Sequence, residues 1–320
     1  MKKVLLINTG GTIAMSEDQK TGKVSPSQHN PLLTQSSFFN TLADLEVVDL
    51  FNLPSPHMTS QEMLKLSQYI QDHAANFDGI VITHGTDTLE ETAYFLDLTL
   101  KIDQPVVLTG AMRSSNEIGS DGLANLRSAI LVARAEASAQ RGVLVVMNEE
   151  IHTATYVTKT HTTNVATFQT PTFGPVGLVA KSQVIYFQQL MRRDYYPVAK
   201  MTQRVALLKT YAGMEGDLIE AVAQNGYQGL VIEGLGAGNL PPATLAALEQ
   251  LIVQGLPVVM VSRAFNGVIE DIYDYTGGGK QLRQMGVIFA QGLSGVKARI
   301  KLMVVLNATE PVAIDQAFRL

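Results

Sequence analysis

The chain of 320 residues contains no cysteine. It therefore has no disulfide, no thiolate ligand for a metal and no cysteine nucleophile. Charged residues make up only 17% and the net charge is -5, so the chain lacks the basic surface with which proteins bind duplex nucleic acid. No apolar run approaches the roughly 20 residues that cross a bilayer. We predict a protein with neither nucleic-acid nor membrane partners.

Common catalytic signatures are also missing. The sequence has neither the G-x-S-x-G turn of α/β-hydrolases nor the HExxH pair of zinc proteases. It also lacks the phosphate-binding motifs G-x-G-x-x-G and G-x-x-x-x-G-K-[ST]. His84 and His161 have no second ligand at metal-binding spacing, so we predict no metal site.

The N-terminus begins with two lysines and continues into an apolar run at residues 4–7. This run ends in a glycine-rich turn, which makes it too short for the apolar region of a secretory signal. We interpret it as a first β-strand and predict a cytoplasmic protein.

Short apolar runs alternate with segments of helical spacing along the chain. The runs lie at residues 4–7, 80–83, 106–108, 143–147, 205–208, 230–232 and 258–261. Such alternation is typical of parallel sheets covered by helices on both faces. We predict an α/β protein of two domains, each a mostly parallel sheet flanked by helices, with the larger domain at the N-terminus.

Residues 187–204, which include the run RRDYYP, interrupt this alternation. We predict a linker there, between an N-terminal domain of residues 1–186 and a C-terminal domain of residues 205–320. Helix starts are predicted at capping boxes opened by Thr59 and Thr88, and at Asp121 or Gly122. A further helix is predicted from residue 241 or 242 to residue 254.

Polar and glycine-rich clusters follow several predicted strands directly. They lie at residues 9–12, 83–88, 109–114 and 233–239. Ligands of parallel α/β sheets bind beyond the carboxyl ends of the strands, so several clusters at one edge indicate a convergent site. On its own, Gly10-Gly11 is more typical of a tight turn than of a site, and Thr86-Asp87-Thr88 is more typical of a helix cap.

The residues available at these clusters are threonine hydroxyls, one lysine and one aspartate. A threonine becomes a nucleophile only when a base takes its proton, and a desolvated lysine such as Lys159 can be that base. Backbone N–H groups of the glycine-rich turns can hold an oxyanion. The residues alone therefore indicate a threonine-dependent acyl-transfer hydrolase.

The motif TGGTIA at residues 9–14, together with HGTDT at residues 84–88, resembles the two signature segments of the bacterial L-asparaginase/glutaminase family. The likeness extends over nearly the whole chain. It includes SPHM at 55–58, LTGAMR at 108–113, RGVLVVMN at 141–148, VTKT at 157–160, GAGNL at 236–240 and KAR at 297–299.

The resemblance implies a catalytic set of four residues. Thr12 corresponds to the primary nucleophile, which attacks the side-chain amide of L-asparagine to form an acyl-enzyme that water then hydrolyses. Thr86, Lys159 and Asp87 correspond to the second triad, which assists proton transfer.

The resemblance also implies a substrate-binding set, to which Thr86 belongs as well. Ser55 corresponds to the residue that binds the substrate α-carboxylate, Asp87 to the one that binds the α-ammonium group, and Gly11 lies in the same set. Asn239 corresponds to a residue contributed by the neighbouring subunit. The implied assembly is a homotetramer, a dimer of intimate dimers, without a cofactor.

Two departures from the family pattern stand out. The lid of the family often carries a tyrosine that orients the nucleophile, but residues 14–30 contain none and the first tyrosine of the chain is Tyr69. The acidic residue that some secreted members supply from the partner subunit has only loose candidates, Glu270 and then Asp271. Residues 275–282 are closer to cytoplasmic members.

Three alternatives to an L-asparaginase remain open from the sequence. One is a mixed glutaminase-asparaginase, and a second is the glutamine-deamidating subunit of a tRNA-dependent amidotransferase, which carries extra sequence. A third is a non-catalytic amino-acid-binding protein on the same scaffold. The missing lid tyrosine is the one feature that favours the third alternative, and the complete set of Thr12, Thr86, Asp87 and Lys159 argues against it.

Overall fold

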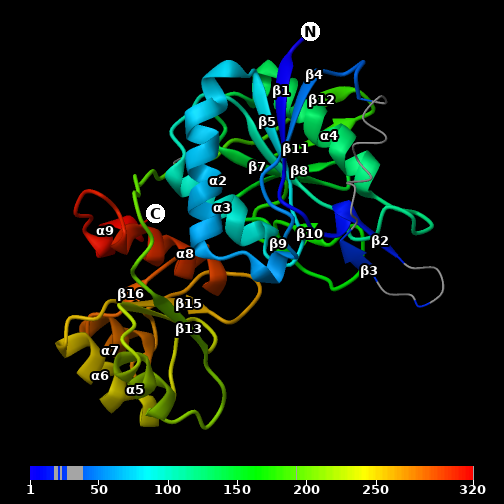
Figure 1. The fold of residues 1–320 in the computed structure, drawn as a ribbon. Coiled ribbons are helices and arrows are strands. Elements are labelled where there is room, and N and C mark those ends of the chain that lie inside the picture. Colours follow the sequence, from blue (N-terminus) through cyan, green and yellow to red (C-terminus); the bar gives the residue numbers. More distant parts are fainter. Residues whose placement is uncertain (18–20, 22–23, 27–38, 192, 320) are drawn as a thin grey trace. The chain divides into compact units, whose positions relative to one another are not determined.

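The computed structural model describes residues 1–17, 21, 24–26, 39–191 and 193–319. Contacts divide the chain into an N-terminal unit, Met1–Tyr195, and a C-terminal unit, Tyr196–Leu320. The dividing point lies within residues 187–204, the stretch predicted as a linker, in which Arg192 is outside the described residues. Each unit has its own sheet (Figure 1). Each unit also has its own core of buried apolar side chains.

The N-terminal unit is built on an eight-stranded sheet with the order β12-β11-β8-β7-β6-β5-β1-β4. Its parallel part consists of β4 (Asp44–Asp49), β1 (Lys3–Asn8), β5 (Gly79–Thr83), β6 (Val106–Thr109) and β7 (Val143–Met147). The antiparallel strands β8 (Glu150–Thr153), β11 (Gly177–Ala180) and β12 (Gln183–Tyr186) complete it. The predicted strands in this half are confirmed. Strand β4 was not predicted, because it is a partly exposed edge strand without an uninterrupted apolar run.

Helices cover both faces of this sheet. Side chains of a strand alternate between its faces, and the core follows this rule. Val4 and Leu6 of β1 pack with residues of α4 (Gly122–Arg134), whereas Leu5 and Ile7 pack with residues of α2 (Ser60–His73) and α3 (Leu89–Thr99). Both faces of β1 are therefore buried, as its uninterrupted apolar run requires.

The two predicted capping boxes have different outcomes. Thr59 does open α2, with its hydroxyl accepting from the Gln61 N–H and with Glu62 accepting from the Thr59 N–H at 3.2 Å. The box at Thr88 is wrong. Thr88 precedes α3, but its hydroxyl donates to the carbonyl of Ser55 at 2.9 Å and makes no cap bond. The hydrogen bond to Ser55, which lies on another turn, replaces the capping bond within the helix start.

The C-terminal unit has a four-stranded parallel sheet with the order β13-β14-β15-β16. Its strands are β13 (Val205–Lys209), β14 (Gly229–Gly234), β15 (Val258–Ser262) and β16 (Ile288–Phe289). Its helices are α5 (Asp217–Gln224), α6 (Leu245–Val253), α7 (Gly279–Gln284), α8 (Gly295–Leu306) and α9 (Ile314–Ala317). The predicted helix after residue 241 begins as a 3-10 turn, Pro242–Thr244, before α6.

The predicted fold class is confirmed, with mostly parallel sheets flanked by helices in a larger N-terminal and a smaller C-terminal domain. Four short strands lie outside these two sheets. They are β2 (Met15–Glu17), which pairs with β3 (Val24–Pro26), and β9 (Thr158–Lys159), which pairs with β10 (Phe168–Gln169). Among the described residues, none of the helices is both long and apolar enough to span a membrane.

Candidate active site

The first glycine-rich turn leaves β1 and is tied to the end of β5. The N–H and the hydroxyl of Thr9 both donate to the carbonyl oxygen of Thr83, at 3.1 and 2.8 Å. Gly10 and Gly11 have φ values of +103° and +86°, a region that other residues rarely adopt. Thr12 then begins a 3-10 turn, Thr12–Ala14. The tight-turn interpretation of the two glycines is correct, and it is compatible with a site.

Three turns meet at Gly85. A β-carbon added to Gly11 would lie 2.3 Å from the α-carbon of Gly85, and one added to Gly85 would lie 2.8 Å from the hydroxyl oxygen of Ser55. Backbones approach this closely only where side chains are absent. Thr12 and Thr86 each follow one of the two touching glycines, so the two threonines lie on turns that are in direct contact.

A lysine from a distant segment joins the second turn. The Nζ of Lys159, in β9, lies 3.0 Å from the Oγ1 of Thr86 and 2.7 Å from the Oδ1 of Asp87. Thr86 is buried, the Lys159 side chain is 16% exposed, and the Asp87 side chain is 61% exposed. The arrangement gives Thr86 a nitrogen partner that can exchange a proton and leaves Asp87 open to a ligand.

Ser55 holds the same turn from the other side. Its buried hydroxyl accepts from the N–H of Asp87 at 3.2 Å, and its carbonyl accepts from Thr88. The structure therefore brings together five predicted site residues, namely Gly11, Ser55, Thr86, Asp87 and Lys159, with Thr12 on the adjoining turn.

His84 is a structural member of this turn. Its side chain is buried, and burial lowers its pKa from 6.5 to about 4, because the cation would lose its hydration. Its Nδ1 lies 2.8 Å from the carbonyl of Gly85, which can only accept, so Nδ1 carries the proton. Its Nε2 then accepts from the hydroxyl of Thr92 at 3.0 Å. His84 is thus a neutral support for the backbone between Thr83 and Thr86.

Two polar residues organise the loop after β6, namely Asp121, predicted only as a possible helix start, and Asn125, which the sequence did not single out. The carboxylate of Asp121 accepts from the N–H groups of Met112 and Arg113 at 3.0–3.1 Å. Asn125 donates to the carbonyl of Gly110 and accepts from the N–H of Asn148, both within 3.0 Å. Asp121 directly precedes the helix at Gly122, where an acidic residue is also typical of a helix start, so the sequence alone does not distinguish this role.

The same loop reaches the nucleophile turn. The N–H and the hydroxyl of Ser115 both donate to the carbonyl of Met15, at 3.3 and 3.0 Å. Met15 follows the Thr12–Ala14 turn directly, and buried Ile13 of that turn packs against Gly122. The turn that carries Thr12 is therefore anchored at its exit and in the core.

The remaining predicted residues lie in the C-terminal unit. Asn239 is 9% exposed, its Oδ1 accepts from the N–H of Gly279 at 3.2 Å, and its Nδ2 donates to the carbonyl of Leu235 at 3.4 Å. Glu270 is exposed. Asp271, the alternative acidic residue, forms an ion pair of 3.1 Å with Arg283. Their predicted contribution to a neighbouring subunit stays a prediction.

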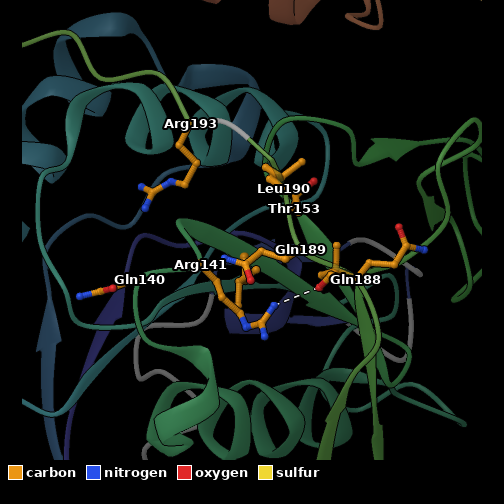
Figure 2. A pocket seen from close by; sticks show the side chains of 9 residues that line it. Gln140, Arg141, Thr153, Gln188, Gln189, Leu190 and Arg193 are labelled. Atoms are coloured by element: carbon orange, nitrogen blue, oxygen red, sulfur yellow. Dashed lines mark hydrogen bonds between the residues drawn. The ribbon is translucent and has the colours of Figure 1, made fainter. Parts of the chain in front are cut away.

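A separate pocket of about 50 Å³ in the N-terminal unit contains none of the predicted site residues (Figure 2). Arg141 reaches across it to the carbonyl of Gln188 at 3.0 Å, and Arg193 nearby forms an ion pair of 3.4 Å with buried Asp97. The guanidinium groups of Arg141 and Arg193 are thus already bonded to other residues of the same unit. In the part of the chain that the structure describes, no three His, Cys, Asp or Glu side chains gather as a metal ion would require.

Comparison with known proteins covers the whole chain. The family model described as "Asparaginase, N-terminal" matches residues 3–192, and the model described as "Glutaminase/Asparaginase C-terminal domain" matches residues 204–318. An "L-asparaginase" of Bacillus licheniformis is 38% identical over 307 residues, which are 95% of each chain. A "Glutaminase-asparaginase" of Pseudomonas fluorescens biotype A is 29% identical, over 97% of this chain and 88% of that protein.

A solved structure is similar to the whole chain as well. The "Crystal Structure of Probable Cytoplasmic L-asparaginase from Campylobacter jejuni" superimposes with a TM-score of 0.87 at 34% sequence identity, over 99% of each chain. Similarity of sequence and of structure thus extends through both units.

Proposed function

This chain belongs to the asparaginase family, and we propose that it hydrolyses L-asparagine to L-aspartate and ammonia through an acyl-enzyme on Thr12. The enzyme is an amidohydrolase. The observation that carries the proposed mechanism is the contact of Thr86, Lys159 and Asp87 on a turn that touches the turn of Thr12. Lys159 lies more than 70 residues from Thr86 and Asp87 in the sequence, so a helix cap at residues 86–88 does not account for this contact.

The reaction proceeds in two steps. In the first, the Thr12 hydroxyl oxygen attacks the side-chain amide carbon of L-asparagine, its proton passes to the leaving nitrogen, and ammonia departs, which leaves a β-aspartyl ester on Thr12. Backbone N–H groups of the turns at Gly11 and Gly85 stabilise the negative oxygen of the tetrahedral intermediate. In the second, water attacks the ester carbon, and Thr12 recovers its proton as L-aspartate is released.

Thr86, Lys159 and Asp87 move protons and hold the substrate in this mechanism. Thr86 Oγ1 and Lys159 Nζ are 3.0 Å apart, within the distance that a proton transfer requires. The exposed carboxylate of Asp87 binds the α-ammonium group of the substrate, and the hydroxyl of Ser55 contributes to binding its α-carboxylate. Each of these groups already lies on the turn at Gly85 or is hydrogen-bonded to it, so little rearrangement is needed on binding.

Removal of single hydroxyls tests this assignment. Thr12→Ala and Thr86→Ala should each reduce ammonia release from L-asparagine by about 10³-fold or more, because each removes a group that takes part in bond making. Thr309→Ala, which removes an exposed threonine of the C-terminal unit, is the matched control and should keep full activity. Full activity of Thr12→Ala or Thr86→Ala would refute the role of that threonine.

L-Glutamine is the competing substrate, since a relative carries both activities in its name. One extra methylene changes discrimination by about 1–3 kcal/mol, which corresponds to roughly 10- to 200-fold in kcat/KM. We propose a preference for L-asparagine within that range. Equal kcat/KM for the two amides would identify a mixed glutaminase-asparaginase instead. A titration in which L-aspartate binds while the enzyme releases no ammonia would identify a non-catalytic binding protein.

We also propose a cytoplasmic homotetramer, a dimer of intimate dimers, in which Asn239 and Glu270 reach the site of a neighbouring subunit. The family resemblance supports this arrangement, and both residues lie on the turns after β14 and β15 of the C-terminal unit. Light scattering should give four times the 34.7 kDa mass of the chain. A monomer with full activity would exclude a shared site.

A further inference from the structure

Glu90 is a buried carboxylate that the proposed reaction does not use. It is the second residue of α3 (Leu89–Thr99), the helix that begins directly after the turn of Thr86 and Asp87, and it is 8% exposed. Carboxylates are rarely buried unless they are paired, because losing hydration is costly. Some interaction within the fold must therefore offset the cost of placing Glu90 there.

One oxygen of Glu90 binds the segment that carries the lysine. Its Oε1 accepts from the hydroxyl of Thr158 and from the backbone N–H of Lys159, both at 3.1 Å. Its Oε2 is buried and has no hydrogen-bond partner among the described residues. The Oε2 atom of Glu90 thus lacks a hydrogen bond, which is uncommon in a native core. This indicates that Glu90 is kept at this position at a cost in stability.

The segment that Glu90 holds has little structure of its own. Strand β9 consists of Thr158 and Lys159 alone, and among the described residues it pairs only with the two-residue strand β10 (Phe168–Gln169). A pair of such short strands is weak. The long side chain of lysine also has many rotamers, so the position of its Nζ depends on where its backbone is fixed.

We propose that Glu90 is a positioning residue, which fixes the backbone of Lys159 so that its Nζ reaches Thr86. Lys159 is then attached at both of its ends to one structural unit, the turn of Thr86 and the first turn of α3. The Nζ contacts Thr86 and Asp87, and the backbone N–H contacts Glu90. A displacement of about 1 Å in a catalytic group can cost about 10²-fold in rate. This inference rests on the proposed function, since it assigns Glu90 a part in the same reaction.

Steady-state kinetics of four variants test the proposal. Glu90→Leu removes both acceptor bonds at similar volume and should lower kcat about 10- to 100-fold, with KM within about threefold, because Lys159 acts in proton transfer. Glu90→Gln keeps an acceptor oxygen and should retain kcat within about threefold. Thr158→Val removes one of the two bonds and should lower kcat about three- to tenfold. Glu91→Leu, one residue along α3, is the matched control and should leave kcat unchanged.

The outcomes separate this inference from the proposed function. If the unsubstituted enzyme releases no ammonia from L-asparagine, the proposed function fails, whatever Glu90 does. If the unsubstituted enzyme is active and Glu90→Leu keeps the same kcat, only the positioning role fails. Equal losses in Glu90→Gln and Glu90→Leu would also overturn it, because they would show that the charge matters and the hydrogen bonds do not. If Glu90→Leu does not fold, the Gln and Thr158→Val variants decide.

Discussion

The two units end their parallel strands in glycine-rich turns, yet only one edge assembles reactive groups. In the N-terminal unit, the turns after β1 and β5 touch at Gly11 and Gly85, and Lys159 comes in from a third segment. In the C-terminal unit, the turn after β14 is closed by its own asparagine, since Asn239 bonds to Leu235 and Gly279. Similar sequence patterns thus serve an open site in one unit and a sealed turn in the other.

The difference has a physical origin in what the glycines allow. Gly11 and Gly85 permit two backbones to approach within contact distance, so side chains from both turns project beside each other. In the turn of residues 235–239, the carbonyl and N–H of Leu235 pair with the N–H and carbonyl of Asn239, which satisfies the backbone locally. Within one chain, the polar cluster after β5 therefore leaves its side chains for a ligand, whereas the cluster after β14 bonds mainly to its own backbone.

Substitution of the touching glycine should break the N-terminal arrangement most severely. Gly11→Ala places a β-carbon 2.3 Å from Gly85 and strains a φ of +86°. We expect a loss of at least about 3 kcal/mol in unfolding free energy and of at least about 10²-fold in kcat. Gly267→Ala is the control in the C-terminal unit, because it has a φ of +97° with no atom near the added carbon. It should cost only about 1–2 kcal/mol and no activity. Equal losses of unfolding free energy in Gly11→Ala and Gly267→Ala, measured by chemical denaturation, would contradict the importance of the contact between Gly11 and Gly85.

We expect acid to destabilise the N-terminal unit more than the C-terminal unit, because His84 is buried in the N-terminal unit. Its pKa falls from 6.5 in the unfolded chain to about 4 in the fold, so the unfolded state binds the proton first as the pH drops. The contribution of the neutral His84 ring to the free energy of unfolding is fully present above pH 6.5. It is lost as the pH falls from 6.5 to 4, and the free energy of unfolding decreases by about 3 kcal/mol. His161 is the last histidine of the chain, so the C-terminal unit contains none. His84→Asn should flatten the pH dependence of unfolding in that window, and an unchanged slope would exclude His84 as its source.

The smallest effect is expected at the sealed turn. Asn239→Ala removes the acceptor for Gly279 and the donor to Leu235, which should cost about 1–2 kcal/mol of unfolding free energy. Asn239→Asp keeps the acceptor and should cost less in a thermal melt. The Ala variant should also have a raised KM for L-asparagine, because Asn239 is proposed to reach the site of a neighbouring subunit, and an unchanged KM would contradict that contribution. Unchanged stability in both variants would mean that the turn does not depend on this side chain.

The sequence predicted the elements with long, regular patterns. Buried strands such as β5 and β7 are uninterrupted apolar runs, and the capping box of Thr59 is a local interaction, so both could be recognised without the fold. Strands β9 and β4 could not, since one is two residues long and the other is a partly exposed edge. The false capping box at Thr88 failed because Ser55, more than 30 residues away, supplies a better partner for its hydroxyl.

The supporting residues of the site were equally hidden. Asp121, Asn125 and Ser115 act through backbone groups of distant turns, and nothing in their local sequence distinguishes this from helix capping or solvent exposure. Glu90 lies in a charged helix start where an acidic residue is ordinary. The predicted lid without the family's tyrosine is residues 14–30, and of these residues 18–20, 22–23 and 27–30 lie outside the described residues.

By itself, the sequence determined the α/β class, the two domains and the residue types able to cleave an amide, because these depend on periodicity, turn chemistry and motifs that are local. The tertiary structure decided which of those residues meet. Lys159 reaches Thr86 and Asp87 across more than 70 residues of chain, and Glu90 holds it there. Such contacts depend on packing between turns, in which two glycines let backbones touch, and no property of a single segment encodes that approach.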